Sequence, residues 1–500
     1  MRFLIRFSGE ITTKSRQTRA RFMQLLRRNI EDALSSEGIA YEFHWDWSRF
    51  YVDTPEPGAK DVLQRVFGIQ SFSEIRSFPV SDLDRLVTTG KELFRDHVKD
   101  RTFAVRARRG DRDVPFGSQE IERELGAALL PYAQGVDLNN PDVTAYVEIR
   151  HGEIHFFTER HEGPGGLPIG AEGRAVALVS GGFDSAVAAW LMLKRGVVLD
   201  YVFCNLGGVA HLQGVLRVMK VIADRWSYGV SPKLFVVDFR PLVQDLQRTT
   251  KSRYWQVLLK RAMYRAAEHV AGRKPTGRGI VTGEALGQVS SQTLSNLDVI
   301  SRAAELPVLR PLLGFDKEEI IARSRAIGTY ELSAAIQEYC AIAPGNPVTR
   351  SRPARVEEIE ADLDAELFRD VLADLETHGL RNLDPEDLRL PSVELDHVPD
   401  GARLIDVRAP QARRAWGHPD AEPWDFFQAL DDFPNWERDP TYVCVCEIGL
   451  KSADLAERMR EAGFDAYSLA GGVKTLHQRT LSDDDTPIDE LPDAAIALYE

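Results

Sequence analysis

The segment Ser180–Ser185 reads Ser-Gly-Gly-Phe-Asp-Ser, directly follows the apolar run Ala175–Val179, and precedes a helical pattern. Glycine lets a backbone turn tightly and approach a ligand closely. Free N–H groups in such a loop and at the start of the helix point at an anion. The hydroxyls of Ser180 and Ser185 add donors, and no Gly-Lys-Ser/Thr follows, which excludes a Walker A loop. The pattern therefore predicts a phosphate-binding loop, whereas a glycine pair alone would indicate only a turn.

A second reactive position is Cys446, which ends an apolar strand and opens the loop Cys446–Ser452 in front of a helix. A thiol that faces a helix N-terminus ionises more readily than a free thiol, and successive loop N–H groups stabilise an anion above it. This environment suits a persulfide, whose outer sulfur is anionic and reactive. A phosphatase of related fold uses Cys-x5-Arg, and Ser452 occupies the arginine position. The loop therefore favours sulfur chemistry over phosphate chemistry.

The remaining cysteines do not suggest a metal centre. The chain has four cysteines without paired CxxC spacing, so no tightly bound zinc and no iron–sulfur cluster is expected. Cys204 and Cys444 lie inside apolar strands and are interpreted as structural, although strand alternation puts Cys444 on the same face as Cys446. His211 is compatible with a place near a nucleotide or with a surface role.

The elements around the phosphate loop indicate a parallel α/β sheet, because apolar strands alternate with helical patterns from residue 174 onward. The predicted strands are Ala175–Val179, Leu199–Cys204, Leu234–Val237 and Ile280–Val281. A Gly- and Pro-rich segment at 163–170 predicts a linker or a large turn before this sheet. Strands at 403–407 and 442–446 predict a smaller α/β unit near the end of the chain.

The N-terminal third has a different pattern of predicted secondary structure, in which short strands and amphipathic helices indicate α+β units. A strand at 3–7, a helix at 16–34 and aromatic-rich strands at 41–45 and 49–52 form the first of these units. The predicted divisions are 1–60 and 61–165 (two α+β units), 172–345 (the parallel α/β domain), 346–398 (an acidic, partly helical connector) and 399–485 (the small α/β domain).

Composition limits the class of protein. The chain has 500 residues, is 43% hydrophobic and carries a formal net charge of −14, so several cores are expected but not a uniformly basic surface. Basic residues nevertheless cluster at 14–28 and 101–109, which leaves nucleic-acid binding about as plausible as a solvated basic face. No run of about 18 apolar residues occurs, so a cytoplasmic protein without a membrane span is expected.

The hexapeptide Ser180–Ser185 resembles the PP-loop of ATP pyrophosphatases, which cleave ATP to AMP and pyrophosphate while adenylating an oxygen. The resemblance implies that Asp184 lies at the pyrophosphate and helps to hold Mg²⁺. The implied nucleotide contacts of the loop and the strand before it are Leu178, Val179, Ser180, Gly181, Gly182, Phe183 and Ser185.

Further motifs are similar to the 4-thiouridine synthetase family, which is also tied to thiamine biosynthesis. They are Gly283–Thr293 (GEALGQVSSQT), Asn205–Gly208 (NLGG), Leu309–Leu312 (LRPL) and Glu338–Cys340 (EYC). The resemblance covers nearly the whole chain and makes Lys260, Gly283 and Gln292 nucleotide contacts. It implies a multidomain α/β fold with a ferredoxin-like unit, a tRNA-binding THUMP domain, a PP-loop pyrophosphatase domain and a C-terminal rhodanese-like domain.

The loop at Cys446 resembles the rhodanese active site, together with Asp406–Arg408 and Gly471–Val473. The family resemblance implies that ATP adenylates O4 of a tRNA uridine, at position 8, and that a Cys446 persulfide supplies sulfur. Cys340 then resolves the intermediate as a Cys340–Cys446 disulfide. The implied partners are tRNA, a cysteine desulfurase and the sulfur-carrier protein of thiamine thiazole synthesis, with a homodimer as the assembly.

Three other interpretations remain open at this point. The PP-loop alone permits an amidating or ligating enzyme with an unrelated C-terminal appendage, although no glutaminase domain is found. The rhodanese-like unit alone would suffice for a sulfur carrier in thiamine synthesis. A tRNA-binding module with inactive catalytic parts is the third, and the intact loops at Asp184 and Cys446 argue against it.

Overall fold

The fold is taken from a computed structural model. It describes residues 1–46, 48–110, 114–206, 208–273, 277–336, 347–384, 393–408, 410–446, 449–473 and 476. The chain divides into a first unit, Met1–Ala171 with Lys194–Gly196, and a second unit, Glu172–Leu193 with Val197–Glu500. Within the described parts, no helix is long and apolar enough to cross a membrane.

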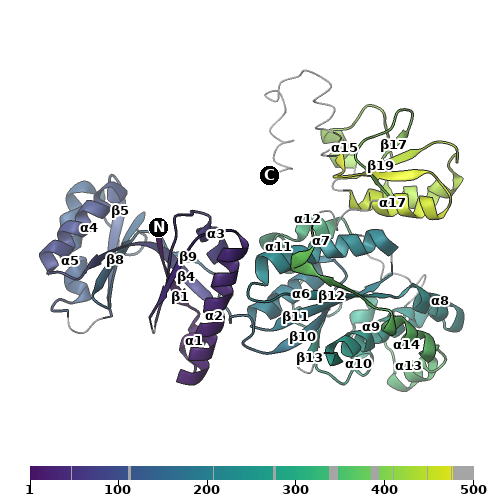
Figure 1. The fold of residues 1–500 in the computed structure, drawn as a ribbon, viewed down its shortest axis with the longest axis horizontal. Helices are drawn as coiled ribbons and strands as arrows, with labels where there is room; N and C mark the ends of the chain where they lie inside the picture. The colour runs from purple at the N-terminus through teal and green to yellow at the C-terminus, as the bar shows by residue number, and fades with distance from the viewer. Residues whose placement is uncertain are drawn as a thin grey trace. The chain divides into compact units, whose positions relative to one another are not determined.

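The first unit is built on one nine-stranded sheet in the order β2-β3-β1-β4-β8-β7-β5-β6, with β9 paired to β4 (Figure 1). Its strands are β1 (Arg2–Phe7), β2 (Glu42–Trp45), β3 (Phe50–Asp53), β4 (Ile69–Pro79), β5 (Thr102–Arg109), β6 (Gly135–Val136), β7 (Val143–Arg150), β8 (Glu153–Phe157) and β9 (His161–Glu162). Its helices are α1 (Gly9–Thr12), α2 (Arg16–Ser36), α3 (Ala59–Leu63), α4 (Leu83–Val98) and α5 (Ser118–Leu129).

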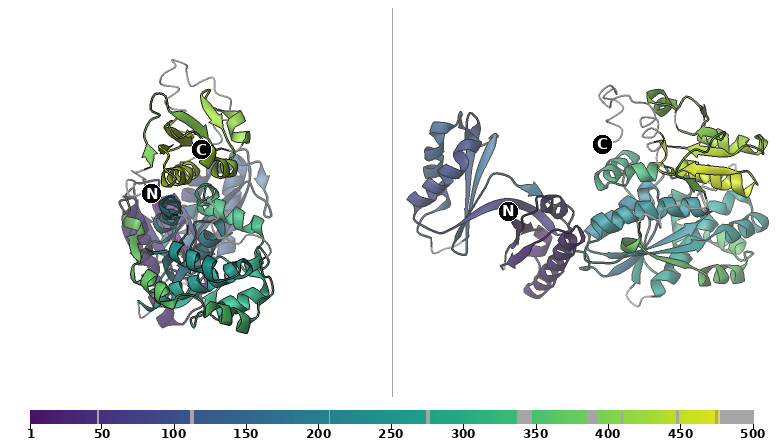
Figure 2. Two further views of the ribbon diagram at one scale, coloured as in Figure 1. Left: turned by 90° about the vertical axis from the view of Figure 1, so that its right-hand side faces the viewer. Right: turned by 45° about the horizontal axis from the view of Figure 1, so that its top comes forward.

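The helix predicted at 16–34 is confirmed as α2. Ser15 caps it by accepting a hydrogen bond from the backbone N–H of Thr18, and its buried residues include Phe22, Leu26 and Ile30. The strand β4 is 11 residues long and pairs with β1 on one side and with β8 on the other. It serves both α+β halves of the unit (Figure 2), so the predicted division at residue 60 falls before an element that the halves share.

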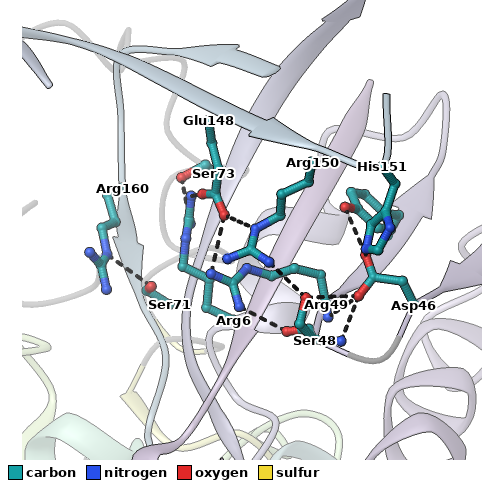
Figure 3. Close-up of polar contacts among 11 residues, drawn as sticks. Arg6, Asp46, Ser48, Arg49, Ser71, Ser73, Glu148, Arg150, His151 and Arg160 are labelled. Carbon is teal, nitrogen blue, oxygen red and sulfur yellow. Dashed lines mark hydrogen bonds and ion pairs between the residues drawn. The ribbon is translucent and has the colours of Figure 1, made fainter. Parts of the chain in front are cut away.

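A buried ion network joins the two halves of the first unit across this sheet (Figure 3). Glu148 on β7 lies 3.3 Å from Arg6 on β1, 3.2 Å from Arg49 and 2.6 Å from Arg150. Arg6 also donates to Ser73 on β4 at 3.0 Å. One carboxylate therefore bonds to three guanidinium groups: Arg6 of β1, Arg49 just before β3, and Arg150 at the end of β7 itself.

The charge of Glu148 depends on these partners. Burial alone raises the pKa of its carboxyl, but Arg49, Arg6 and Arg150 outweigh burial and lower the pKa from 4.5 to about 2. A depressed pKa in the folded state stabilises the protein fully above the unfolded value. The contribution of Glu148 is therefore present above about pH 4.5 and is lost as the pH falls towards 2.

Replacing Glu148 with glutamine should lower the free energy of unfolding of the first unit by about 3 kcal/mol or more, because buried guanidinium charges lose their counter-charge. Urea unfolding of the full chain, followed by hydrogen exchange of β1 and β7, measures this loss. Glu153→Gln is the matched control, because the Glu153 side chain is 42% exposed and forms a longer ion pair with Arg2, at 3.6 Å. Its loss should lower the free energy of unfolding by less than about 1 kcal/mol. Equal losses in both variants would contradict a stabilising network.

The second unit contains a six-stranded sheet in the order β14-β13-β10-β11-β12-β15. Its parallel strands are β10 (Arg174–Leu178), β11 (Val198–Asn205), β12 (Lys233–Asp238), β13 (Gly277–Val281) and β14 (Val308–Leu309). The associated helices are α6 (Phe183–Lys194), α7 (Gly208–Trp226), α8 (Arg240–Thr249), α9 (Trp255–Gly272), α10 (Leu294–Ser301), α11 (Lys317–Ile327) and α12 (Tyr330–Ala334). The predicted parallel α/β sheet is confirmed, with α7 and α11 on one side and α9 and α10 on the other (Figure 1).

The acidic segment read as a connector is largely part of this body. It forms α13 (Pro353–Glu360), α14 (Ala365–Ala373) and β15 (Glu376–Gly379), and β15 pairs antiparallel with β12. Val356, Ile359 and Leu372 pack into the core beneath the sheet. Glu360 bonds both Arg261 and Arg265 of α9, at 2.7 and 2.8 Å. Glu360 thus forms ion pairs with α9, and Asp364 caps the start of α14. The segment through β15 is therefore packed onto the central sheet and is not a flexible link between domains.

A separate five-stranded parallel sheet lies near the end of the chain, in the order β16-β20-β19-β17-β18. Its strands are β16 (Glu394–Leu395), β17 (Arg403–Asp406), β18 (Ala421–Pro423), β19 (Tyr442–Val445) and β20 (Ala466–Leu469), and its helices are α15 (Pro410–Ala415), α16 (Phe426–Asp432) and α17 (Leu450–Glu461). The strands predicted at 403–407 and 442–446 are found as β17 and β19. The sheet begins at β16, before the predicted boundary at 399.

Candidate active sites

The phosphate loop connects β10 to α6, as predicted. Gly181 has φ +78°, and a Cβ at this position would collide with Ile336, so the turn requires glycine. Ser185 donates its hydroxyl to the carbonyl oxygen of Gly182 at 3.0 Å and accepts from the N–H of Ser180 at 3.3 Å. The Ser185 hydroxyl therefore closes the loop on itself instead of lying open to a ligand. Phe183 stacks on Tyr330, with ring centroids 5.3 Å apart.

Asp184 is held by two partners that come from distant parts of the chain. Gln288 donates to its Oδ2 at 2.8 Å, and Lys317 Nζ lies 3.1 Å from its Oδ1. Lys317 is the first residue of α11, where a positive charge opposes the helix dipole. Sequence reasoning missed Lys317. The unfavourable place of this lysine at a helix start is the signal that could have identified it.

Position 283 requires glycine, because its backbone lies directly against the backbone of Asp184 and Ser185. A Cβ on Gly283 would lie 2.6 Å from the carbonyl carbon of Asp184 and 2.7 Å from the N of Ser185. The segment after β13 thus presses against the start of α6. Nearby, Gln292 is 7% exposed and its Oε1 has no hydrogen-bond partner within the described residues, which leaves an acceptor next to the loop that carries Gln288.

Gly283→Ala should weaken nucleotide binding about tenfold or more, because the new methyl group must displace the phosphate-loop backbone. Equilibrium titration of the full chain with ATP measures the change. Gly314→Ala is the control, since a Cβ there meets nothing within 4 Å. If both variants bind ATP equally well, the close approach is not needed for the site.

Lys260 has a structural partner. Its Nζ lies 3.2 Å from Glu284, which also accepts from Arg310 at 2.8 Å and from the hydroxyls of Thr282 and Tyr264. Burial raises the pKa of the Glu284 carboxyl, but Lys260, Tyr264 and Arg310 together outweigh burial and lower the pKa to about 2. Lys260 is thus neither a solvated helix lysine nor an isolated charge, and it belongs to a buried cluster directly after Gly283.

His211 lies on α7 and is 6% exposed, so a surface role is wrong. The backbone of Ser180 is one of its hydrogen-bond partners, and its ring meets that of Phe203 edge-on at 4.7 Å. Burial lowers the pKa of His211 to about 4, so the imidazole is neutral at pH 7 and supports the loop without adding charge.

The sulfur of Cys446 lies at the end of β19 and faces the first turn of α17, as predicted. It accepts from the N–H of Ser452 at 3.5 Å and from its hydroxyl at 3.3 Å. Gly449, with φ +89°, precedes the helix. Cys444 and Cys446 are fully buried, and burial raises the pKa of the Cys444 thiol, so Cys444 stays protonated.

Two neighbouring motifs shape the same loop. Asp406 and Arg408, both almost fully buried, form an ion pair at 2.6 Å. Gly471 and Gly472 have positive φ angles, and Val473 donates its N–H to the carbonyl oxygen of Cys446 at 2.9 Å. Cys340 lies outside the described residues. Among the described residues, no group of three or more His, Cys, Asp or Glu side chains could hold a metal ion.

Comparison with known families divides the chain consistently with this architecture. Residues 2–73 match the ThiI ferredoxin-like domain, 80–159 match the THUMP domain, and 170–365 match the family described as thiamine biosynthesis protein (ThiI). The ferredoxin-like match extends past the predicted boundary at 60 and into β4.

Individual relatives cover most of the chain. The tRNA sulfurtransferase of Desulfurococcus amylolyticus is 38% identical over 94% of this chain and 97% of its own length. That of Marinobacter nauticus is 40% identical over 82% and 86%. A 4-thiouridine synthetase, solved as an RNA complex with bound ATP, is similar in structure with a TM-score of 0.66 and 34% identity over 75% of this chain and 98% of its own. PH1313 from Pyrococcus horikoshii gives a TM-score of 0.52 with 30% identity over 66% and 100%. The resemblance to the 4-thiouridine synthetase family is confirmed, and the chain belongs to the tRNA sulfurtransferase (ThiI) family of enzymes.

Proposed function

We propose that this enzyme uses ATP to activate O4 of a tRNA uridine and then replaces that oxygen with sulfur carried on Cys446, giving 4-thiouridine. The observation that carries the proposal is the occurrence, in one chain, of a phosphate loop with an oriented carboxylate–lysine pair at Asp184 and a loop that directs hydrogen-bond donors at Cys446. Neither an amidating ligase nor a simple sulfur carrier needs both.

The activation step uses the carboxyl edge of the central sheet. Loop N–H groups between β10 and α6 bind phosphate oxygens, and Lys317 supplies positive charge where pyrophosphate leaves. The uridine O4 attacks the α-phosphate of ATP, so that AMP becomes attached to the base and makes O4 a good leaving group. By the family resemblance, we also assign Lys260, Gly283 and Gln292 to nucleotide binding.

A magnesium ion that accompanies ATP fits this donor set. Mg²⁺ is usually held by one or two carboxylates together with substrate phosphates and water, and Asp184 is one such carboxylate at the loop. Bound there, Mg²⁺ would neutralise phosphate charge. Asp184 itself keeps Lys317 at the phosphate end of the site.

The sulfur step uses Cys446. A cysteine desulfurase is the assigned donor of its persulfide sulfur, and the outer sulfur attacks C4 of the activated base and displaces AMP. Cys340 then attacks the Cys446 sulfur, which releases the thiolated base and forms a Cys340–Cys446 disulfide. An external dithiol must reduce this disulfide before the next turnover.

The first unit is assigned to tRNA binding. Arg106, Arg108 and Arg109 lie on β5, with exposed or half-exposed side chains on that strand, and α2 carries further exposed arginines. Such a surface provides phosphate contacts and shape recognition of an RNA helix. The family relative solved with RNA supports this assignment.

The test is a reconstituted reaction of the purified chain with unmodified tRNA, ATP, Mg²⁺, cysteine and a cysteine desulfurase. Mass spectrometry of the digested tRNA should show 4-thiouridine that depends on ATP. If no 4-thiouridine forms while Cys446 accepts sulfur, the result favours the second proposed role, a sulfur donor to thiamine thiazole synthesis, in a family described as thiamine biosynthesis protein.

A further inference from the structure

The sulfur of Cys446 is the end of a short chain of buried hydroxyls. Ser452, on α17, places its Oγ 3.3 Å from the sulfur and 2.8 Å from Oγ of Ser468 on β20. Ser468 in turn lies 3.3 Å from the carbonyl oxygen of Gly449. Cys446, Ser452 and Ser468 all have 0% exposed surface, so within this arrangement the hydroxyls can bond only to protein groups.

The hydrogen bonds along this chain of hydroxyls can run in either of two directions, depending on whether Cys446 is a thiol or a thiolate. Each hydroxyl has one proton to donate, and a thiolate can only accept. When Cys446 is a thiol, its S–H can donate to Ser452, Ser452 to Ser468, and Ser468 to Gly449. When Cys446 is a thiolate, Ser452 must donate to sulfur, and the Ser468 proton can then turn from Gly449 to Ser452. Turning two hydroxyl protons therefore switches the chain, and no heavy atom needs to move.

We propose that Ser452 is a catalytic residue that stabilises the Cys446 thiolate, and that Ser468 is a positioning residue that takes the Ser452 proton while Cys446 is a thiol. The proposal deepens the function proposed above and concerns its sulfur-loading step. A hydrogen bond to an ionised acceptor is about twice as strong as one to a neutral acceptor. The Ser452 hydroxyl therefore stabilises Cys446 most strongly when the sulfur is a thiolate.

The loading step that needs this charge is a thiol exchange. The Cys446 thiolate attacks the outer sulfur of a donor persulfide, and a new S–S bond joins that sulfur to Cys446. The S–S bond of the donor breaks, and its electron pair leaves on the donor thiolate. No oxidant or reductant is consumed. After this step the Sγ of Cys446 carries neither a charge nor a proton, so the Ser452 hydroxyl can again donate to Ser468.

Other charges near the loop do not replace Ser452. The charged and titratable side chains on β17, β19, β20 and α17 are those of Arg403, Asp406, Tyr442, Cys444, Lys451, Asp454, Glu457, Arg458, Arg460, Glu461 and Tyr467, and Arg408 lies just after β17. Asp406 bonds to Arg408 at 2.6 Å and Asp454 to Arg458 at 3.2 Å, and Cys444 stays protonated. Lys451 adds a positive charge at the start of the helix. Ser452 directs two donors, its N–H and its hydroxyl, at the sulfur, which suits one singly charged sulfur.

The test is the pH dependence of Cys446 alkylation by iodoacetamide in the full chain, followed residue by residue with mass spectrometry. Ser452→Ala should raise the midpoint of the pH–rate profile by about one pH unit or more, whereas Ser452→Thr, which keeps the hydroxyl, should retain the original midpoint. Ser468→Ala removes the competing acceptor for the Ser452 proton, so its midpoint should stay the same or fall.

A purely structural role predicts a different result, because loosening the loop would move both alanine variants in one direction. The proposal is overturned if Ser452→Ala leaves the midpoint unchanged, or if Ser468→Ala raises it as Ser452→Ala does. Should Ser452→Ala fail to fold, as judged by hydrogen exchange of α17 and β19, Ser468→Ala decides alone. Alkylation needs no tRNA, ATP or sulfur donor, so this result is separate from whether 4-thiouridine forms.

Discussion

Replacing Cys446 with alanine should reduce 4-thiouridine formation by at least ~1,000-fold, while ATP-dependent activation of tRNA continues. The sulfur atom that carries the persulfide is lost, and water or free sulfide at ordinary concentration cannot reproduce its placement. Activation survives because Asp184 on α6, Lys317 on α11 and the phosphate loop after β10 belong to the domain of the six-stranded sheet, whereas β19 belongs to the five-stranded sheet. The two measurements are 4-thiouridine by mass spectrometry and tRNA-dependent release of pyrophosphate from ATP.

Cys444→Ala is the matched control for this experiment. Cys444 lies on β19, two residues before Cys446, and is equally buried, but burial raises the pKa of its thiol, so Cys444 stays protonated. The control should therefore thiolate tRNA at a rate close to that of the unchanged chain. Full turnover by Cys446→Ala with a physiological sulfur donor would remove the Cys446 persulfide from the mechanism.

Sequence reasoning identified the parts of both sites that are contiguous in the chain. The loop Ser180–Ser185 and the loop after Cys446 each follow an apolar strand and precede a helix, and these local patterns survive folding because strand, turn and helix are formed by neighbouring residues. The parallel order of the central sheet could also be predicted, since parallel strands need helical crossovers.

The parts that were missed depend on contacts between distant residues. Lys317 and Gln288 reach Asp184 across 133 and 104 positions, and the Arg6–Glu148 contact spans 142. The spacing of apolar residues within one helix or strand does not show which distant residues will be in contact. The acidic segment differs from its prediction for a related reason. Its acidic, Pro-interrupted sequence suggested a partly helical connector, whereas Val356 and Ile359 pack into the core of the central domain.

Replacing Asp184 with asparagine should have the converse effect to Cys446→Ala. Activation of tRNA should fall by about 100- to 1,000-fold, while Cys446 still accepts sulfur from a persulfide donor. Asparagine keeps the size of the side chain and an acceptor for Gln288, but it removes the charge that holds Lys317 at 3.1 Å and the carboxylate assigned to Mg²⁺. Release of pyrophosphate and persulfide loading, measured on the same preparation, separate the two half-reactions.

Asp238→Asn provides the control on the same sheet. Asp238 is the last residue of β12, and its half-exposed carboxylate pairs with Arg240 at 2.8 Å outside the phosphate loop, so removing its charge should leave activation within about twofold, as expected for a solvated ion pair. Equal losses in the two variants would mean that the reaction depends on the overall charge at the edge of the sheet. A selective loss in Asp184→Asn, with sulfur loading intact, assigns activation to the Asp184 carboxylate and shows that the two half-reactions can be separated within one chain.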